Sequence, residues 1–263
     1  MSAARAPRPA RSAARPAPVD VAIRDGVAWL TLARPDAGNA CDAELMAALA
    51  EACEQAADDE RVRVAVLAAR GPRFCVGLPR GCRWPSPAWV DGVAALAALP
   101  KPVVAALDGE ARGWGLALAL ACDLRIASSA AVLAVSGLTP GAFPGGGVTQ
   151  RLARTLGVAR ALELVLVGEA LPAARAAEWG LVNQVVPRAR LAHAVAAAAR
   201  RLAARGPLAL RLAKEAVVRA LDLPLADGIR LEEDLYVLCQ TTDDRREGIR
   251  AFLERRPPRF TGR

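Results

Sequence analysis

The sequence is poor in the residues that several common kinds of site require. It contains one histidine, and its six cysteines form no Cys-x-x-Cys pair, so a zinc site is not expected. Aromatic residues are 4% of the chain, which gives little support for stacking on single-stranded nucleic acid. No apolar run reaches membrane-spanning length without a charge. A chain of 263 residues with a large core needs no disulfides, so a reduced cytoplasm is the expected location.

Lysine is also scarce, with Lys101 and Lys214 its only examples, so the net charge of +8 comes almost entirely from arginine. The bias could reflect a GC-rich genome or attraction to an anion, and a phosphate-bearing small molecule fits the charge as well as nucleic acid does. Only residues 1–18 concentrate arginine without acids. We interpret them as a disordered basic tail or a misassigned start, since they lack the continuous apolar stretch of a secretion signal.

Apolar residues are 54% of the chain and many are alanine, which favours a large core rich in helix. Strand and helix patterns alternate as far as about Pro187, and helical patterns alone follow. This order predicts an α/β core over residues 19–187 and a C-terminal helical subdomain over residues 188–263. The expected strands are residues 19–24, 27–33, 61–68, 103–107, 124–127, 132–135 and 181–186. The expected helices are residues 42–57, 86–99, 116–122, 148–156, 159–167, 172–179, 189–205, 207–221, 227–240 and 243–254.

Two segments could supply chemistry through main-chain groups. In Asp108–Asp123 a buried strand ends, small residues turn the chain, and an apolar helix begins. The first N–H groups of such a helix have no acceptor inside it and could stabilise a carbonyl that gains negative charge. Arg73–Leu78 likewise follows a strand and leads into a loop. Each segment alone is better explained as an ordinary junction, but together they could form an oxyanion hole.

Further segments match one known pattern in order along the chain. They are Arg34-Pro35 with Asn39-Ala40, Phe74–Gly77, Lys101–Ala106, Gly109–Asp123, Phe143–Gly147, Thr149–Leu152, Ala173–Val182 and Thr242–Pro258. With this set, the chain from about Val19 to Arg263 resembles the crotonase (enoyl-CoA hydratase/isomerase) superfamily. The resemblance implies an α/β crotonase-like core of ββα turns with two β-sheets. It also implies C-terminal helices that build a homotrimer or a dimer of trimers.

The resemblance implies a CoA thioester as substrate, with no cofactor apart from the coenzyme A that the substrate carries. Its carbonyl is expected between the main-chain N–H groups of Leu78 and Trp114. Most relatives have glycine where this chain has Trp114. Tryptophan still donates its N–H, so the oxyanion hole can survive, and the indole could instead fill part of the acyl pocket.

Hydratases of this family share proton transfer between two glutamates, and both are absent here. One position, a helical turn beyond the second N–H donor, is Ala117, and the other is Gly137. A third acidic position that some relatives use falls at Gly145 or Gly146. Neither alanine nor glycine has a side chain that can transfer a proton. We therefore expect very weak or no hydration of crotonyl-CoA.

Other side chains near these segments have two interpretations each. Glu110 could be a displaced acid or base, or it could form a structural ion pair with Arg112 two residues later. Asp91 could reach the pocket or be a solvated surface acid. Cys75 and Cys82 lack a nearby thiolate-stabilising partner in sequence and are expected to be small core or loop residues. His193, in an alanine-rich helix, is assigned no catalysis.

Arginines could contact the charged parts of the substrate. Arg80 and Arg83 could bind CoA phosphates or an acyl carboxylate, or they could lie in a solvated loop. The resemblance suggests that Arg255, Arg256 and Phe260 lie near the nucleotide end of CoA, in the same or in a neighbouring subunit.

Three functions remain open from the sequence. The first is an enzyme of the lyase, isomerase or decarboxylase type that stabilises a thioester enolate without the usual acid–base pair. The second is a non-catalytic acyl-CoA-binding partner subunit of the same fold. A nucleic-acid binder rests only on charge and on residues 1–18, and a membrane partner is not expected.

Overall fold

The computed structural model describes residues 17–79, 81–82, 88–136 and 143–263. Its centre is a six-stranded sheet in the order β1-β2-β3-β4-β6-β9. Every neighbouring pair is parallel except the hairpin β1–β2, which turns at Asp25 and Gly26, both at positive φ. The strands are Val19–Arg24, Val27–Leu32, Val64–Ala69, Val103–Leu107, Leu124–Ser128 and Gln184–Val186.

A second, three-stranded sheet consists of β5 (Glu110–Arg112), β7 (Val132–Ala134) and β8 (Leu171–Pro172). Cys75 adds a parallel bridge to Ala111 of β5. The sequence predicted β7 but neither β5 nor β8, because these two strands are defined by pairing with segments that are distant in sequence. Glu110 lies beyond the end of β4 and begins a strand of the small sheet.

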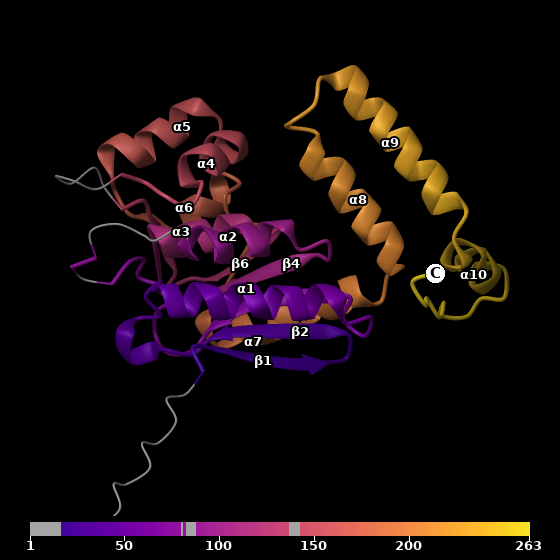
Figure 1. The fold of residues 1–263 in the computed structure, drawn as a ribbon, viewed down its shortest axis with the longest axis horizontal. Helices are drawn as coiled ribbons and strands as arrows, with labels where there is room; N and C mark the ends of the chain where they lie inside the picture. The colour runs from indigo at the N-terminus through magenta and orange to yellow at the C-terminus, as the bar shows by residue number, and fades with distance from the viewer. Residues whose placement is uncertain (1–16, 80, 83–87, 137–142) are drawn as a thin grey trace, which may run out of the picture.

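Helices cover both faces of the large sheet (Figure 1). On one face α1 (Ala43–Asp58), α2 (Ala88–Ala98) and α3 (Trp114–Ala121) share the main core with the alternate side chains of β2, β3 and β4. On the other face α7 (Leu191–Ala203) packs through Leu191 and Val195 against side chains of β2, β3, β4 and β6, which are Val27, Val64, Val66, Val104 and Ile126. Helix α7 follows the boundary predicted at Pro187, yet it packs on the sheet.

The remaining helices lie at the two ends of the core. At one end are α4 (Val148–Leu156), α5 (Val158–Leu162), the π-helical turn η2 (Glu163–Val167) and α6 (Ala173–Glu178). At the other end α8 (Pro207–Arg219), α9 (Leu225–Gln240) and α10 (Asp243–Leu253) extend away from the core (Figure 1) and are called the C-terminal arm below. Short 3-10 turns, η1 (Pro35–Ala37) and η3 (Arg188–Arg190), complete the chain. None of the helices in the described ranges combines the length and apolar character needed to cross a bilayer.

Candidate active site

The loop between β2 and α1 holds the segment that leads to Leu78. Asn39 is fully buried at positive φ, and its Nδ2 donates to the carbonyl oxygens of Arg70 (3.0 Å) and Arg73 (2.9 Å). Two main-chain hydrogen bonds also join the two segments. Val76 N–H donates to the Gly38 oxygen (3.1 Å), and Cys41 N–H donates to the Gly77 oxygen (2.7 Å). The Asn39 side chain thus satisfies buried carbonyls and fixes where residues 73–77 run.

On its other side this segment pairs with β5. Cys75 N–H donates to the Glu110 oxygen and Arg112 N–H donates to the Cys75 oxygen, both at 2.9 Å. Gly77 lies at φ 90°, and a Cβ placed on it would stand 2.9 Å from the Arg112 oxygen and 3.5 Å from the Trp114 nitrogen. Only glycine permits that approach. Because Leu78 follows Gly77 directly, the structure brings the two segments singled out from the sequence together.

Glycines also shape the start of α3, which begins at Trp114, two residues earlier than predicted. Gly113 has φ 54° and ψ −112°, and its N–H donates to the Ala134 oxygen of β7 at 2.9 Å. A Cβ on Gly113 would stand 2.1 Å from Ser136 Oγ, and one on Gly115 would stand 2.3 Å from the Cys75 oxygen. The short turn therefore needs glycine on both sides of Trp114.

Ser136 was not identified from the sequence. Its hydroxyl lies against Gly113 at the N-terminus of α3, where a polar hydrogen can meet developing negative charge. The available signal was its place directly before Gly137, one of the two missing-acid positions. Gly137 itself lies outside the described residues, as do Arg80 and Arg83, and of Asp91 only the backbone is described.

The other missing-acid position is described in full. Ala117 is fully buried one turn along α3 from Trp114. A Cβ on Gly146 would stand 2.7 Å from Ala117 Cβ. The space beside Ala117 is therefore filled by the glycine-rich segment before α4.

Glu110 and Arg112 form the ion pair that was one of their two predicted interpretations, with Arg112 Nε 2.6 Å from Glu110 Oε1. Both side chains are partly exposed, whereas Ala111 between them is buried. They therefore project from the side of the small sheet opposite its core-facing residues. The pair is as predicted; a catalytic role for Glu110 stays a prediction.

The cysteines and the histidine occupy structural positions. Cys75 is buried with its Sγ 3.4 Å from Cys41 Sγ, and this contact together with burial raises the pKa of the Cys41 thiol well above its ordinary value. A buried thiol whose thiolate is disfavoured is a poor nucleophile. Cys82 is half-buried, and His193 is exposed on α7. Within the described ranges no histidine, cysteine and carboxylate side chains gather as a metal site would require.

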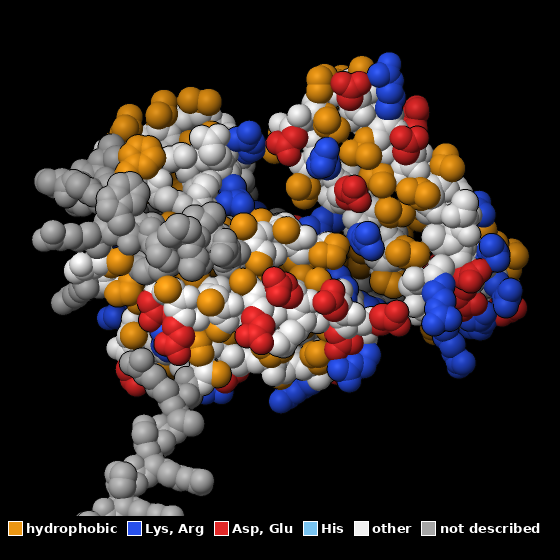
Figure 2. Space-filling model, in the orientation of Figure 1, with side chains coloured by type: hydrophobic (Ala, Val, Ile, Leu, Met, Phe, Trp, Pro, Cys, Tyr) orange, Lys and Arg blue, Asp and Glu red, His pale blue; other side chains and the backbone are white. Residues whose placement is uncertain are grey.

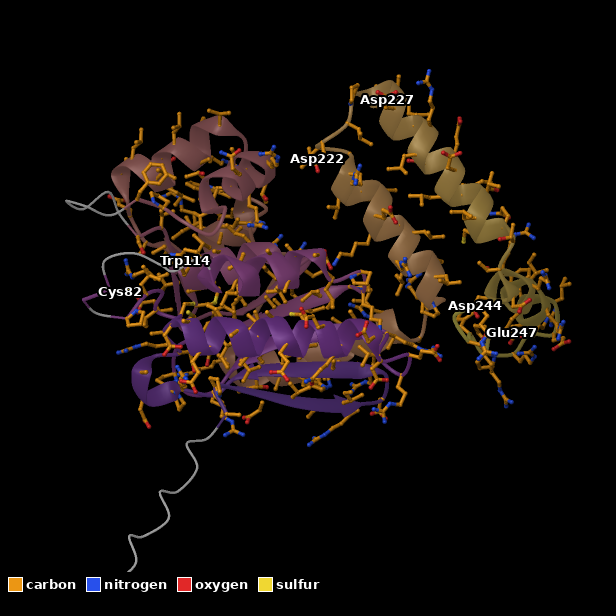
Figure 3. The ribbon with its side chains drawn as sticks, viewed as in Figure 1. Cys82, Trp114, Asp222, Asp227, Asp244 and Glu247 are labelled. Carbon is orange, nitrogen blue, oxygen red and sulfur yellow. The ribbon has the colours of Figure 1, made fainter. Side chains whose placement is uncertain are left out.

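The predicted CoA-contacting residues of the C-terminus lie far from Trp114. Arg256 binds Glu247 through two hydrogen bonds (2.6 and 3.0 Å) and Glu254 through a third (2.5 Å). The Phe260 oxygen accepts a hydrogen bond from Arg63 at 2.6 Å. Arg255, at φ 54°, is exposed. Figure 3 places Glu247 and Trp114 at opposite ends of the molecule, so these residues and Trp114 cannot share one site within a single chain.

Comparison with known proteins gives one consistent result. A family model described as enoyl-CoA hydratase/isomerase matches residues 22–263. The chain is 39% identical over 253 residues to "Enoyl-CoA hydratase domain-containing protein 2, mitochondrial" of Mus musculus, covering 90% of this chain and 85% of that protein. It is 37% identical over 254 residues to (E)-benzylidenesuccinyl-CoA hydratase of Thauera aromatica, covering 93% and 99%.

Solved structures agree. The enoyl-CoA hydratase of Bacillus anthracis superposes with a TM-score of 0.89 at 35% identity, over 94% of this chain and all of that one. A Geobacillus kaustophilus enoyl-CoA hydratase subunit superposes with a TM-score of 0.88 at 38% identity, over 94% and 98%.

Proposed function

The chain belongs to the enoyl-CoA hydratase/isomerase family and has the α/β crotonase-like fold, and from that premise we propose that it binds an acyl-CoA thioester between the N–H groups of Leu78 and Trp114. The observation that carries the proposal is the contact at Gly77, whose Cβ, if present, would stand 3.5 Å from the Trp114 nitrogen. Two main-chain donors that are held rigidly beside each other stabilise an oxyanion without reorganisation.

The proposed chemistry uses this stabilisation without the classical acid–base pair. An enolate formed on the thioester places its negative charge on the oxygen between the two N–H groups. Ala117 and Gly137 cannot move a proton to or from the substrate, and loss of such a group typically costs about 10²–10⁴-fold in rate. Lyase, isomerase or decarboxylase chemistry that depends mainly on enolate stabilisation fits this site better than hydration. The relatives' names describe those proteins as hydratases.

A non-catalytic acyl-CoA-binding subunit is the second candidate. The dense packing of Gly146 against Ala117 favours it, because two residues without an acidic group fill that part of the site. Both candidates use the same two N–H groups and need no cofactor beyond the CoA of the substrate.

Self-association into a homotrimer or a dimer of trimers belongs to this proposal. The C-terminal arm exposes large apolar side chains (Figure 2), among them Val217, Leu225 and Phe252. Arg255, Arg256 and Phe260 reach a CoA bound near Trp114 only from another subunit, since one chain holds them at opposite ends. The cytoplasmic location stays a prediction, because a relative with 39% identity is named as mitochondrial.

A binding measurement with a pair of matched glycine variants tests the proposed site. Gly77→Ala puts a methyl group 2.9 Å from the Arg112 oxygen and should weaken butyryl-CoA binding at least tenfold in calorimetry. Gly180→Ala is the control, because Gly180 has a similar positive φ (80°) but nothing within 4 Å of the added carbon. Equal binding by the two variants would show that the thioester does not bind beside Gly77 and Trp114.

Hydration is measured separately with crotonyl-CoA, by the loss of enoyl absorbance in the unaltered protein. We expect a rate at least about 10²-fold below that of a hydratase that has both glutamates. A rate equal to that of such a hydratase would show that another acid serves the site.

A further inference from the structure

The indole of Trp114 is buried beneath the loop Gly145–Gly147. Trp114 is only 6% exposed. A Cβ on Gly145 would stand 2.9 Å from Cζ2 of the indole and 3.2 Å from its Nε1. A Cβ on Gly146 would stand 3.2 Å from Cε3 of the same ring and 2.7 Å from Ala117 Cβ. The indole therefore fills the space between the start of α3 and the loop, directly beside Ala117.

The loop is fixed in this position from its far side. Arg151, on the first turns of α4, donates from Nη1 to the Gly146 oxygen at 2.9 Å, and its N–H donates to the Gly147 oxygen at 2.9 Å. A Cβ on Gly147 would stand 2.4 Å from Arg151 Nη1. Arg151 is half-buried, and this burial lowers the pKa of its guanidinium. The loop cannot move outward from the indole without breaking these contacts.

The orientation of a bound thioester follows from its size. Two substituents leave the thioester carbon: the CoA moiety, which is too large to bury and must reach solvent, and the acyl group. Trp114 and Ala117 are 6% and 0% exposed, so the side of the site next to them offers the CoA moiety no direct route to solvent. The acyl group, the smaller of the two substituents, is therefore the one assigned to the side of the indole. This step rests on the proposed function, which places the thioester oxygen at the N–H of Trp114.

We infer that the Trp114 side chain sets the upper length of the acyl group, and that the chain takes short-chain acyl-CoA esters. Each additional methylene gains affinity only while there is apolar space to bury it, at about fourfold, or 0.8 kcal/mol, per group. The indole occupies that space, so extra methylenes find no room. Trp114 is thus a specificity-determining residue whose main chain binds the thioester and whose side chain limits the acyl group.

The test measures how affinity depends on acyl length. The dissociation constants of acetyl-, butyryl-, hexanoyl- and octanoyl-CoA are determined for the unaltered protein and for Trp114→Ala. The unaltered protein should show no gain, or a loss, beyond butyryl-CoA. Trp114→Ala keeps the N–H and should gain about fourfold per added methylene from butyryl- to hexanoyl-CoA. If Trp114→Ala does not fold, Trp114→Leu should give an intermediate gain.

Trp179→Ala is the matched control, because Trp179 lies between Arg160 and Arg175 (5.3 and 5.0 Å to the ring) and should leave the length profile unchanged. The same profile in Trp114→Ala and the unaltered protein would overturn the inference, as would unaltered protein that binds octanoyl-CoA more tightly than butyryl-CoA. In both of those cases the proposed function stands. Failure of the unaltered protein to bind any of the four esters would overturn the proposed function and the inference with it.

Discussion

The core and the C-terminal arm use apolar residues in opposite ways. Helix α1 of the core buries its apolar stripe, which consists of Leu45, Met46, Leu49, Ala52, Cys53 and Ala56. Helix α8 of the arm buries none of its thirteen residues, and α9 buries only Leu235. The arm instead exposes large apolar side chains, with Leu225 81% and Phe252 82% exposed. The core thus buries its apolar side chains within the chain, whereas the arm leaves many of its large ones exposed.

Polar contacts with main-chain oxygens join the arm to the core. Lys214 of α8 donates from Nζ to the oxygens of Leu99 (2.8 Å) and Lys101 (3.0 Å) and pairs with Asp123 at 2.7 Å. Arg63 of the core donates to the oxygen of Phe260. These contacts orient the arm without covering its apolar surface. An apolar surface of this kind is typical of a region that packs against another chain, which is why self-association forms part of the proposed function.

The largest effect should come from shortening a core side chain. Leu49→Ala removes a fully buried side chain from α1 and should lower the free energy of unfolding by about 2–5 kcal/mol, through lost burial and the cavity left behind. Leu225→Ala, on the arm, should change it by less than about 0.5 kcal/mol in dilute protein, where the side chain stays in water. Urea unfolding of both variants measures the contrast.

Protein concentration sharpens this comparison. If the arm packs against other subunits, the loss caused by Leu225→Ala should grow as the concentration rises, while that of Leu49→Ala need not. Losses of equal size in dilute protein would mean that the arm is stabilised like the core.

Sequence patterns predicted the fold best where structure is local. The Asp25-Gly26 turn and helix 148–156 are found as predicted. Strand β5 could not be predicted, because it exists through pairing with Cys75 and with β7, which are distant in sequence. Helix α3 starts before its predicted first residue because Gly113, at positive φ, ends the preceding strand at once.

In the candidate site, too, local features could be predicted from the sequence and long-range contacts could not. Ordered motifs singled out Leu78 and Trp114, whose role stays a prediction, and alternation along a strand predicted the Glu110–Arg112 pair, which is found. The contacts of Ser136 with Gly113 and of the Trp114 indole with Gly145 could not be predicted, since each joins segments more than 20 residues apart. Such contacts depend on how whole elements pack, which local periodicity does not record.

A smaller effect should follow from removing the contact that joins the arm to the core. Lys214→Met keeps most of the side-chain stem but leaves the Leu99 and Lys101 oxygens and the Asp123 carboxylate without the ammonium group. The expected loss is about 1–3 kcal/mol, the usual cost of unsatisfied, largely buried polar groups. Arg211→Met is the control, because Arg211 is exposed on the same helix. Thermal unfolding measures both variants. Equal losses of stability would show that the Lys214 contacts do not stabilise the protein more than an exposed arginine does.

The smallest expected effect concerns Glu247, which holds the last residues of the chain onto α10. Arg256 donates two hydrogen bonds to it and the Arg259 N–H donates a third at 2.8 Å, and these contacts lower the pKa of Glu247 from 4.5 to about 2. Because the folded pKa is the lower one, the stabilisation is fully present above about pH 4.5. It is lost as the pH falls toward about 2. Hydrogen-exchange protection of residues 257–263 should fall over that range.

Glu247→Gln separates this carboxylate from its neighbour Asp244, which accepts hydrogen bonds from the N–H groups of Thr261 (2.6 Å) and Gly262 (3.0 Å). The variant should show weaker protection of residues 257–263 already at neutral pH, and a smaller further loss between pH 4.5 and 2. Helix α1 serves as the internal reference, because its buried apolar stripe does not titrate in that range. If the unaltered protein and Glu247→Gln lose protection in parallel as the pH falls, Glu247 does not control how the last residues are held onto α10, and the contrast between arm and core does not depend on this carboxylate.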